Sequence, residues 1–177
     1  YKEATEIIKE NTEKGVFPWT RKNVVTDISN PDRIFSSEVM FATYNQSRKS
    51  LYDGMFSSKG EVNSMLVFKG SSMEDGNLFS KISYFYDDLG DVRRNNHWSV
   101  ETIKVQSDNA GDDDKKQDIL CFGKYIDANK APVRYMIPLI RISEVYLIAA
   151  ECAKTTDEAL GYINAVRTAR NCVKLEL

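Results

Sequence analysis

The chain has 177 residues and a formal net charge of −2, with 42% hydrophobic and 28% charged residues. This composition is typical of a globular domain. Nucleic-acid binding is not expected, because it requires a concentrated basic face and the Lys and Arg residues here are scattered. A membrane-spanning helix is not expected either, since no run reaches the roughly 18 apolar residues that such a helix requires.

Residues 1–15 are predicted to form a scaffold helix. Tyr1, Ala4 and Ile8 recur at helical spacing and make a thin apolar stripe. Gly15 follows as the stop, because glycine readily adopts the left-handed conformation found at helix C-termini. So thin a stripe suits one helix of a repeat-like pair whose partner is missing.

Residues 16–132 are predicted to form a loop-rich insert that contains a few short β-strands. The strand candidates span 36–44, 64–68, 82–86 and 119–126. The connections between these candidates are long and rich in Gly, Ser, Asn and Asp. Loops of such length without structure of their own are either functional or disordered.

Residues 133–172 are predicted to contain a helix pair. We expect the first helix to begin at Pro138, because the missing N–H of proline would be unpaired at a helix start in any case. The positions that follow are apolar on most sides, and such a helix is buried in a larger body. Val145 and Ile148 are therefore expected to lie in the core.

The second helix of the pair is predicted to start after a turn of about two residues. Thr155 and Glu158 have the spacing of a capping box, which satisfies the backbone N–H groups of a helix start. Antiparallel pairs of this kind are the units of TPR-like superhelices, and a single pair cannot bury its own apolar faces. The predicted fold is therefore mainly α, with a TPR-like α–α superhelix as the scaffold for the insert.

The sequence contains few candidate catalytic groups. His97 is the single histidine and no G-x-S-x-G turn occurs, so a nucleophile–histidine relay is not predicted and His97 is expected in an exposed loop. Asp87, Asp88 and Asp91 could supply the two carboxylates of a glycosidase. Closeness in sequence does not set the separation of two carboxylates across a sugar, and aspartates are common in turns. A hydrolase is kept as an alternative.

No metal or cofactor site is predicted. The acidic tract over 108–118 could offer oxygens to calcium, but it lacks the glycine and glutamate positions of an EF-hand loop. The three cysteines have no C-x-x-C spacing, so zinc is not suggested, and Cys121 and Cys152 are expected to be buried thiols. No phosphate-binding glycine loop occurs.

Tyr52 and Trp98 are the leading candidates for ligand contact. Both lie in loop-like sequence, near Arg48 and Asn96. A sugar ring presents a flat patch of C–H bonds that an aromatic plate matches, and the nearby polar groups can bind its hydroxyls. The alternative is that these rings clamp the loops onto the helical scaffold.

The helix pair also carries a family pattern. Its residues are Pro138, Leu139, Ile140, Arg141, Glu144, Val145, Leu147, Ala150 and Glu151, then Ala159, Leu160, Tyr162, Ile163, Asn164, Val166, Arg167 and Ala169. Three weaker pieces precede them: Ser37 to Ala42, Asp91 to Arg94, and Lys124 with Tyr125. In this order they resemble the SusD-like (RagB/SusD) nutrient-binding lipoproteins, although Val92 replaces a proline that is usual in the family.

The resemblance implies a non-enzymatic binding subunit, for an oligosaccharide or another nutrient, on the outer face of the outer membrane. It would sit on a SusC-like TonB-dependent transporter, and its only membrane association would be a lipid anchor outside this chain. Family members are several hundred residues long, so residues 1–177 are expected to be a middle-to-late fragment of one domain. The resemblance also implies that Asp91 and Arg93 form an ion pair. An intracellular TPR-like adaptor for a peptide or a partner protein is the other alternative.

Overall fold

The computed structural model describes residues 1–27, 29–56, 68–69, 82, 85–105, 115–126 and 133–176. Its helices are α1 (Lys2–Lys14), α2 (Lys22–Val25), η1 (Ser36–Glu38), α3 (Arg48–Met55), α5 (Val92–Asn96), η2 (Gly123–Tyr125), η3 (Val133–Tyr135), α6 (Ile142–Glu151) and α7 (Thr156–Ala169). Its strands are β1 (Val39–Tyr44), β2 (Phe68–Lys69), β3 (Trp98–Val105), β4 (Lys115–Phe122) and β5 (Met136–Arg141). The described chain is thus mainly helical with a few short strands, as predicted.

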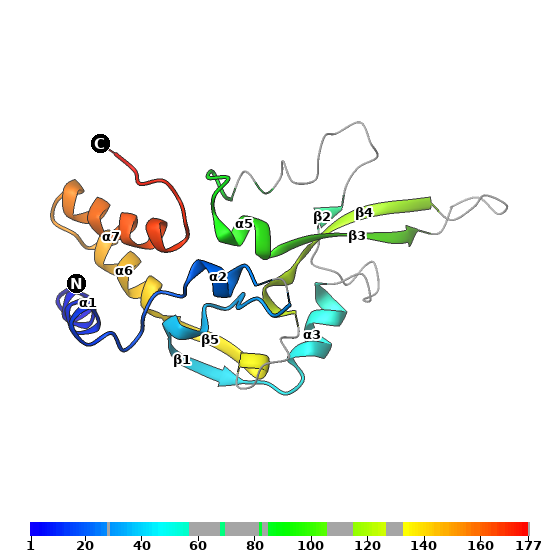
Figure 1. Cartoon of the computed structure of the whole chain (residues 1–177), viewed down its shortest axis with the longest axis horizontal. Coiled ribbons are helices and arrows are strands. Elements are labelled where there is room, and N and C mark those ends of the chain that lie inside the picture. Colours follow the sequence, from blue (N-terminus) through cyan, green and yellow to red (C-terminus); the bar gives the residue numbers. More distant parts are fainter. Residues whose placement is uncertain are drawn as a thin grey trace.

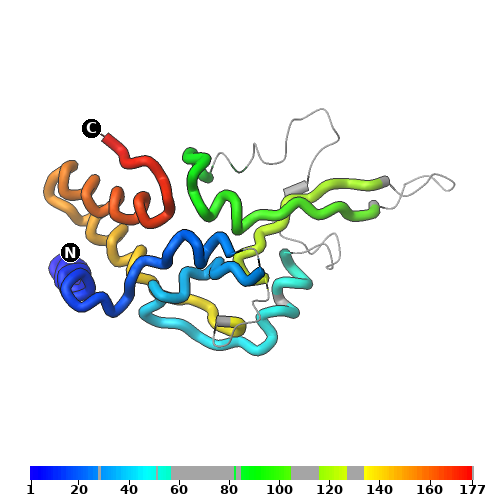
Figure 2. Tube along the Cα trace, in the orientation of Figure 1, coloured from blue at the N-terminus to red at the C-terminus, as the bar shows by residue number. Residues whose placement is uncertain are grey.

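Helices α1, α6 and α7 gather at one end of the molecule, which we call the helical end (Figure 1). The first residues of the chain and its last helices therefore lie together in space (Figure 2). The core at this end consists of Ala4 and Ile8 from α1 with Ile142, Val145 and Ala149 from α6. Helix α1 ends as predicted, because Gly15 adopts φ 63° and its N–H binds the carbonyl of Asn11 at 2.8 Å.

The predicted helix start at Pro138 is wrong. Pro138 lies inside β5, which pairs antiparallel with β1 and places Pro138 opposite Ala42. A two-stranded sheet consists of edge strands alone, where a residue without an N–H is tolerated. The helix begins instead at Ile142, because the Glu144 carboxylate accepts the Arg141 backbone N–H at 3.3 Å and so completes the helix start.

The second helix starts where the sequence predicts. Thr155 is the N-cap of α7, and its hydroxyl accepts the Glu158 N–H at 3.2 Å. The Glu158 carboxylate accepts the Lys154 N–H at 3.2 Å rather than that of Thr155, and it also binds the hydroxyl of Tyr1. Helix α7 is therefore tied at its start to Tyr1, the residue that precedes α1.

A second sheet, in the order β2-β4-β3, extends away from the helical end (Figure 1). Strands β3 and β4 pair over their whole length, from Trp98 opposite Phe122 to Val105 opposite Lys115. The prediction of a strand over 119–126 is partly correct, since β4 starts earlier and gives way to η2 at Gly123. The sequence did not indicate β3.

The three remaining strand predictions fare differently. The strand over 36–44 is partly correct, since Ser36–Glu38 form η1 and Val39–Tyr44 form β1. Of the segment 64–68, only Phe68 lies within the described residues, where it belongs to β2. The strand over 82–86 is wrong: Ile82 is helical, and its carbonyl accepts the N–H groups of Phe85 at 2.9 Å and Tyr86 at 3.0 Å. A carbonyl that binds N–H groups three and four residues ahead belongs to a helical turn.

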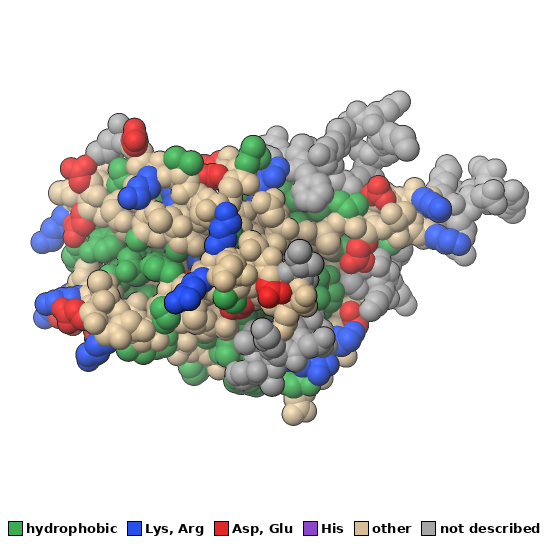
Figure 3. Space-filling model, in the orientation of Figure 1, with side chains coloured by type: hydrophobic (Ala, Val, Ile, Leu, Met, Phe, Trp, Pro, Cys, Tyr) green, Lys and Arg blue, Asp and Glu red, His purple; other side chains and the backbone are tan. Residues whose placement is uncertain are grey.

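The expectation that α6 is buried on most sides is also wrong in part. Val145 is 6% exposed, whereas Ile148 is 50% exposed. Cys152, which follows α6, is exposed, although Cys121 in β4 is buried as predicted. Only the α6 side chains that face α1 and α7 are covered, and Figure 3 shows hydrophobic side chains at the surface of the helical end. No helix in the described part of the chain is long and apolar enough to span a membrane.

Candidate functional site

Arg48 and Tyr52 lie one turn apart on α3. The sequence had predicted an exposed loop at this place, so that prediction is wrong. The Arg48 and Tyr52 side chains are 3% and 6% exposed. The spacing i, i+4 places them on one face of the helix, and this face packs on the chain near β5 and η2. The Arg48 guanidinium donates to the carbonyl of Met136 at 2.7 Å and, more weakly, to that of Ile126 at 3.5 Å.

These two residues line a cavity of about 160 Å³. Its other walls are Met55 and Phe56 from α3, Tyr125 from η2 and Ile137 from β5. The structure therefore brings two of the four predicted ligand residues into one concave site. We call this space the α3 cavity.

Trp98 and Asn96 lie apart from the α3 cavity, at the junction of α5 and β3, and a row of aromatic rings connects the two places. The Tyr52 ring stacks on Phe56 with 6.5 Å between centroids. Phe56 meets Phe122 edge to face at 6.5 Å, and Phe122 contacts Trp98 at 4.9 Å. Trp98 is half-buried because it pairs with Phe122 across β3 and β4, so the predicted loop position is wrong for it.

Several polar groups near this row have no hydrogen-bond partner in the described part of the chain. They are the Tyr52 hydroxyl, the Asn96 side-chain amide nitrogen and the His97 Nε2 atom. The Asn96 backbone carbonyl does have a partner, because the Arg33 Nε donates to it at 2.7 Å. Buried polar atoms without partners are costly, and they are found where a ligand or water completes the site.

His97 is buried, at 3% exposure, and not in an exposed loop as predicted. It caps α5 at its C-terminal end and its ring packs edge to face on Phe35 and Phe122. Burial, aided by the nearby Lys124 charge, lowers the pKa of His97 to about 3. A base this weak is poorly matched to proton transfer at neutral pH, where an efficient base has a pKa near the working pH.

The aspartates that could have served a glycosidase are held by backbone and cationic partners. Asp91 caps α5 by accepting the Arg93 N–H at 2.8 Å and forms the expected ion pair with the Arg93 guanidinium at 2.6 Å. The Asp88 carboxylate accepts the N–H groups of Gly90 at 2.7 Å and Val173 at 2.6 Å. Both carboxylates therefore organise the chain around them.

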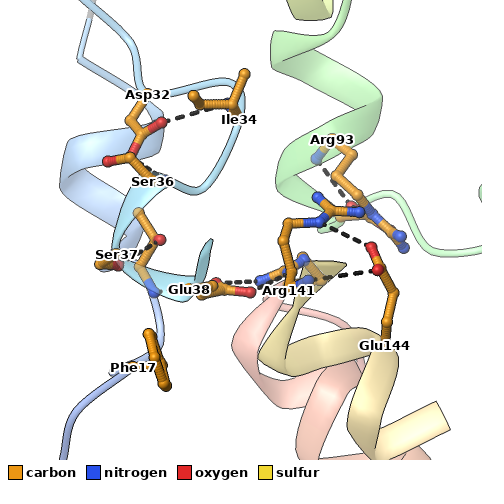
Figure 4. Close-up of polar contacts among 12 residues, drawn as sticks. Phe17, Asp32, Ile34, Ser36, Ser37, Glu38, Arg93, Arg141 and Glu144 are labelled. Carbon is orange, nitrogen blue, oxygen red and sulfur yellow. Dashed lines mark hydrogen bonds and ion pairs between the residues drawn. The ribbon is translucent and has the colours of Figure 1, made fainter. Parts of the chain in front are cut away.

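Residues from the separate family motifs meet near the start of α6. The close-up in Figure 4 contains Glu38, Arg93, Arg141 and Glu144, which come from four different elements or junctions. The Arg141 side chain pairs with Glu144 at 3.1 Å. Burial and the Arg141 charge lower the pKa of Lys124 to about 8. The charged residues of these motifs thus form separate local ion pairs, Asp91 with Arg93 and Arg141 with Glu144, in which Arg93 and Glu144 are partly exposed.

The described residues contain no cluster of three His, Cys, Asp or Glu side chains that could hold a metal ion. The acidic tract over 108–118 lies mostly outside the described residues, which resume at Lys115.

Sequence reasoning missed Met55, Phe122 and Ile137 as parts of this region. One signal was available, because Tyr52 and Met55 are spaced as neighbours on a helix face. No local signal identifies Ile137, which reaches the cavity only because β5 pairs with β1.

Comparisons with known proteins agree with the family pattern in the sequence. A family model described as the SusD family matches residues 20–176. A crystal structure of a SusD superfamily protein from Bacteroides vulgatus ATCC 8482 is similar with a TM-score of 0.49 and 20% sequence identity. That match covers 95% of this chain and 35% of the other, so the chain spans about a third of that protein. No curated protein matches the chain.

Proposed function

The chain belongs to the SusD family, and from this premise we propose that it is part of a non-enzymatic cell-surface subunit that binds a nutrient, most simply an oligosaccharide. Proteins of this family are in general surface-exposed binding proteins of the outer membrane that work with SusC-like transporters. The family match over residues 20–176 is the observation that carries the proposal.

We extend the proposal to the whole protein. The subunit would deliver its ligand to a SusC-like TonB-dependent transporter and would be held at the membrane by a lipid anchor. Its scaffold would be a TPR-like superhelix to which residues 1–15 and the helix pair within 133–172 contribute, with residues 16–132 as the insert. Support comes from α1, α6 and α7, which pack together as consecutive elements of such a scaffold would.

Ligand contact is proposed at the aromatic row and the α3 cavity. Trp98 is half-buried, so part of its ring is available to stack on a sugar. Asn96 is half-buried beside it and has an amide nitrogen without a partner in the described chain. Arg48 and Tyr52 are more deeply buried, and their part is to shape the cavity that the ligand enters.

Trp98→Ala tests this assignment. Loss of one stacking contact, worth on the order of 1 kcal/mol or a little more, should weaken oligosaccharide binding roughly tenfold, since 1.4 kcal/mol is one decade in affinity. Isothermal calorimetry against a panel of oligosaccharides measures the change, and thermal melting reports stability. Val100→Ala is the control, because Val100 is 42% exposed on the same strand and should leave affinity unchanged.

Two results would contradict the proposal. The first is the absence of binding to any oligosaccharide of the panel. The second is the release of new reducing ends when the protein is incubated with oligosaccharides, with release abolished by Asp88→Asn or Asp91→Asn, which would identify a hydrolase.

A further inference from the structure

The α3 cavity is polar at only a few atoms. Of the six described residues that line it, five have aromatic or aliphatic side chains, namely Tyr52, Met55, Phe56, Tyr125 and Ile137. Arg48 is the charged residue among these six. Its two terminal nitrogens donate to the backbone carbonyls of Met136 and Ile126, so the guanidinium serves to hold α3 onto the chain around η2 and β5.

This chemistry restricts what the cavity can hold. A hydroxyl that packs against these walls loses hydrogen bonds to solvent and finds few groups to replace them. The walls of the α3 cavity therefore favour an apolar occupant over the hydroxyl-bearing face of a sugar.

The size of the cavity restricts the occupant further. At about 160 Å³ it is close to the volume of an apolar cavity that accommodates one benzene molecule, roughly 150 Å³. Two of its walls, Tyr52 and Phe56, are stacked rings with only 19° between their planes. Met55, one of the lining residues, is 38% exposed, so this wall of the cavity reaches the surface of the described chain.

We propose that the α3 cavity binds a single apolar ring that is carried as a substituent on the carbohydrate ligand. This inference rests on the proposed function, because it names the chemical group of that ligand which the cavity accepts. The aromatic row continues from Phe56 through Phe122 to the half-buried Trp98, so a stacking partner for the attached sugar lies two rings away from the cavity wall.

Benzene is the probe for the cavity itself. Ligand-observed NMR on the 177-residue chain should show saturable binding, and Met55→Trp, which fills the opening with a larger side chain, should weaken it at least tenfold. Val16→Trp is the matched control, because Val16 is 57% exposed and follows α1 at the helical end. Ile137→Phe reduces the cavity from its β5 wall and replaces Met55→Trp as the test if that variant does not fold. Absence of saturable binding, or equal binding by both tryptophan variants, overturns the proposal.

Glycosides test whether the ring is carried on a sugar. Phenyl β-D-glucopyranoside should bind at least as tightly as benzene and at least tenfold more tightly than methyl β-D-glucopyranoside, and Met55→Trp should remove this preference. Failure of the phenyl glycoside where benzene binds overturns the carbohydrate-borne assignment. If the protein binds oligosaccharides but not benzene, the proposed function stands and this inference is refuted. If it binds benzene but no oligosaccharide, the proposed function is refuted.

Discussion

At the scale of single residues, Arg170 joins the end of α7 to η1. Its guanidinium forms a two-pronged pair with the Glu38 carboxylate, at 2.8 and 2.6 Å, and both side chains are almost completely buried. The same carboxylate accepts the Thr20 N–H at 3.1 Å. The guanidinium also lies over the Phe35 ring at 3.8 Å, so its flat face and its edge are both in contact.

Glu38→Ala should therefore be strongly destabilising. Removal of one partner leaves a buried charge without compensation, which costs about 3–5 kcal/mol. Chemical denaturation of the variant measures the loss in the free energy of unfolding. Glu10→Ala is the control, because Glu10 and Lys14 form an exposed pair on α1 whose loss should not be measurable. A loss for Glu38→Ala no larger than that of the control would contradict the pair's structural role.

His97 should not titrate in the usual range for histidine. Its pKa is lowered to about 3 by burial and by the charges of Lys124, Arg93 and Arg33, whereas an unfolded chain has its usual value near 6.5. Between pH 3 and 6.5 the unfolded state therefore binds more protons at His97 than the folded state does. The free energy of unfolding should not depend on His97 above pH 6.5, and it should decrease as the pH falls from 6.5 toward 3.

NMR checks the pKa directly, because the chain has one histidine and its ring proton resonances are unambiguous. These resonances should not move between pH 8 and 5. A midpoint near 6.5 would instead show an exposed ring, as the sequence alone predicted.

At the scale of elements, Val145 and Ile148 of α6 differ in exposure, although the sequence predicted that both are buried. Val145 faces the core that α1 covers, while Ile148 is half-exposed on another side of the helix. The apolar pattern of α6 shows no difference between these sides. Which side is buried depends on where α1 and α7 pack.

Val145→Asp should lower the melting temperature far more than Ile148→Asp. The first buries an unpaired charge at a cost of several kcal/mol, and the second leaves the carboxylate in contact with water. Thermal melting of the two variants side by side makes the comparison on one helix, with the same chemical change. Equal losses would show that the Ile148 side of α6 is covered in solution.

At the scale of the whole molecule, the chain after α7 is fastened to the loop that precedes α5. The Asp88 carboxylate accepts the Val173 N–H, the Asn171 side chain donates to the Gly90 carbonyl at 2.8 Å, and the Val92 N–H binds the Arg170 carbonyl at 3.0 Å. These contacts join segments about 80 residues apart in sequence. They also hold α5, and with it His97 and Trp98, in place.

Gly90→Ala should loosen this attachment. A Cβ atom at Gly90 would lie 2.7 Å from the backbone oxygen of Asn171, a contact that only a backbone shift can relieve. Gly161→Ala is the matched control, because a Cβ there meets nothing within 4 Å and alanine favours the helix by about 0.5–1 kcal/mol. The melting temperature should fall for Gly90→Ala and rise for Gly161→Ala, and a rise for both would contradict the close contact.

What the sequence alone determined is mostly local. The stop at Gly15 and the Thr155 cap each involve groups within four residues of one another, so their geometry follows from neighbouring residue types. The Asp91–Arg93 pair, in contrast, was expected from the family resemblance. The helix pair and the ordered motifs also identified the family, which the family model confirms.

What only the tertiary structure decided is burial. Pro138 lies in a strand because the residues around it pair with β1. His97 is buried because its ring packs against Phe35 and Phe122. Arg48 and Tyr52 line a cavity and do not lie in the expected loop. The carbonyl that accepts from Arg48 belongs to Met136, 88 positions away in sequence. A side chain's exposure depends on which distant segments cover it, and no local pattern contains that information.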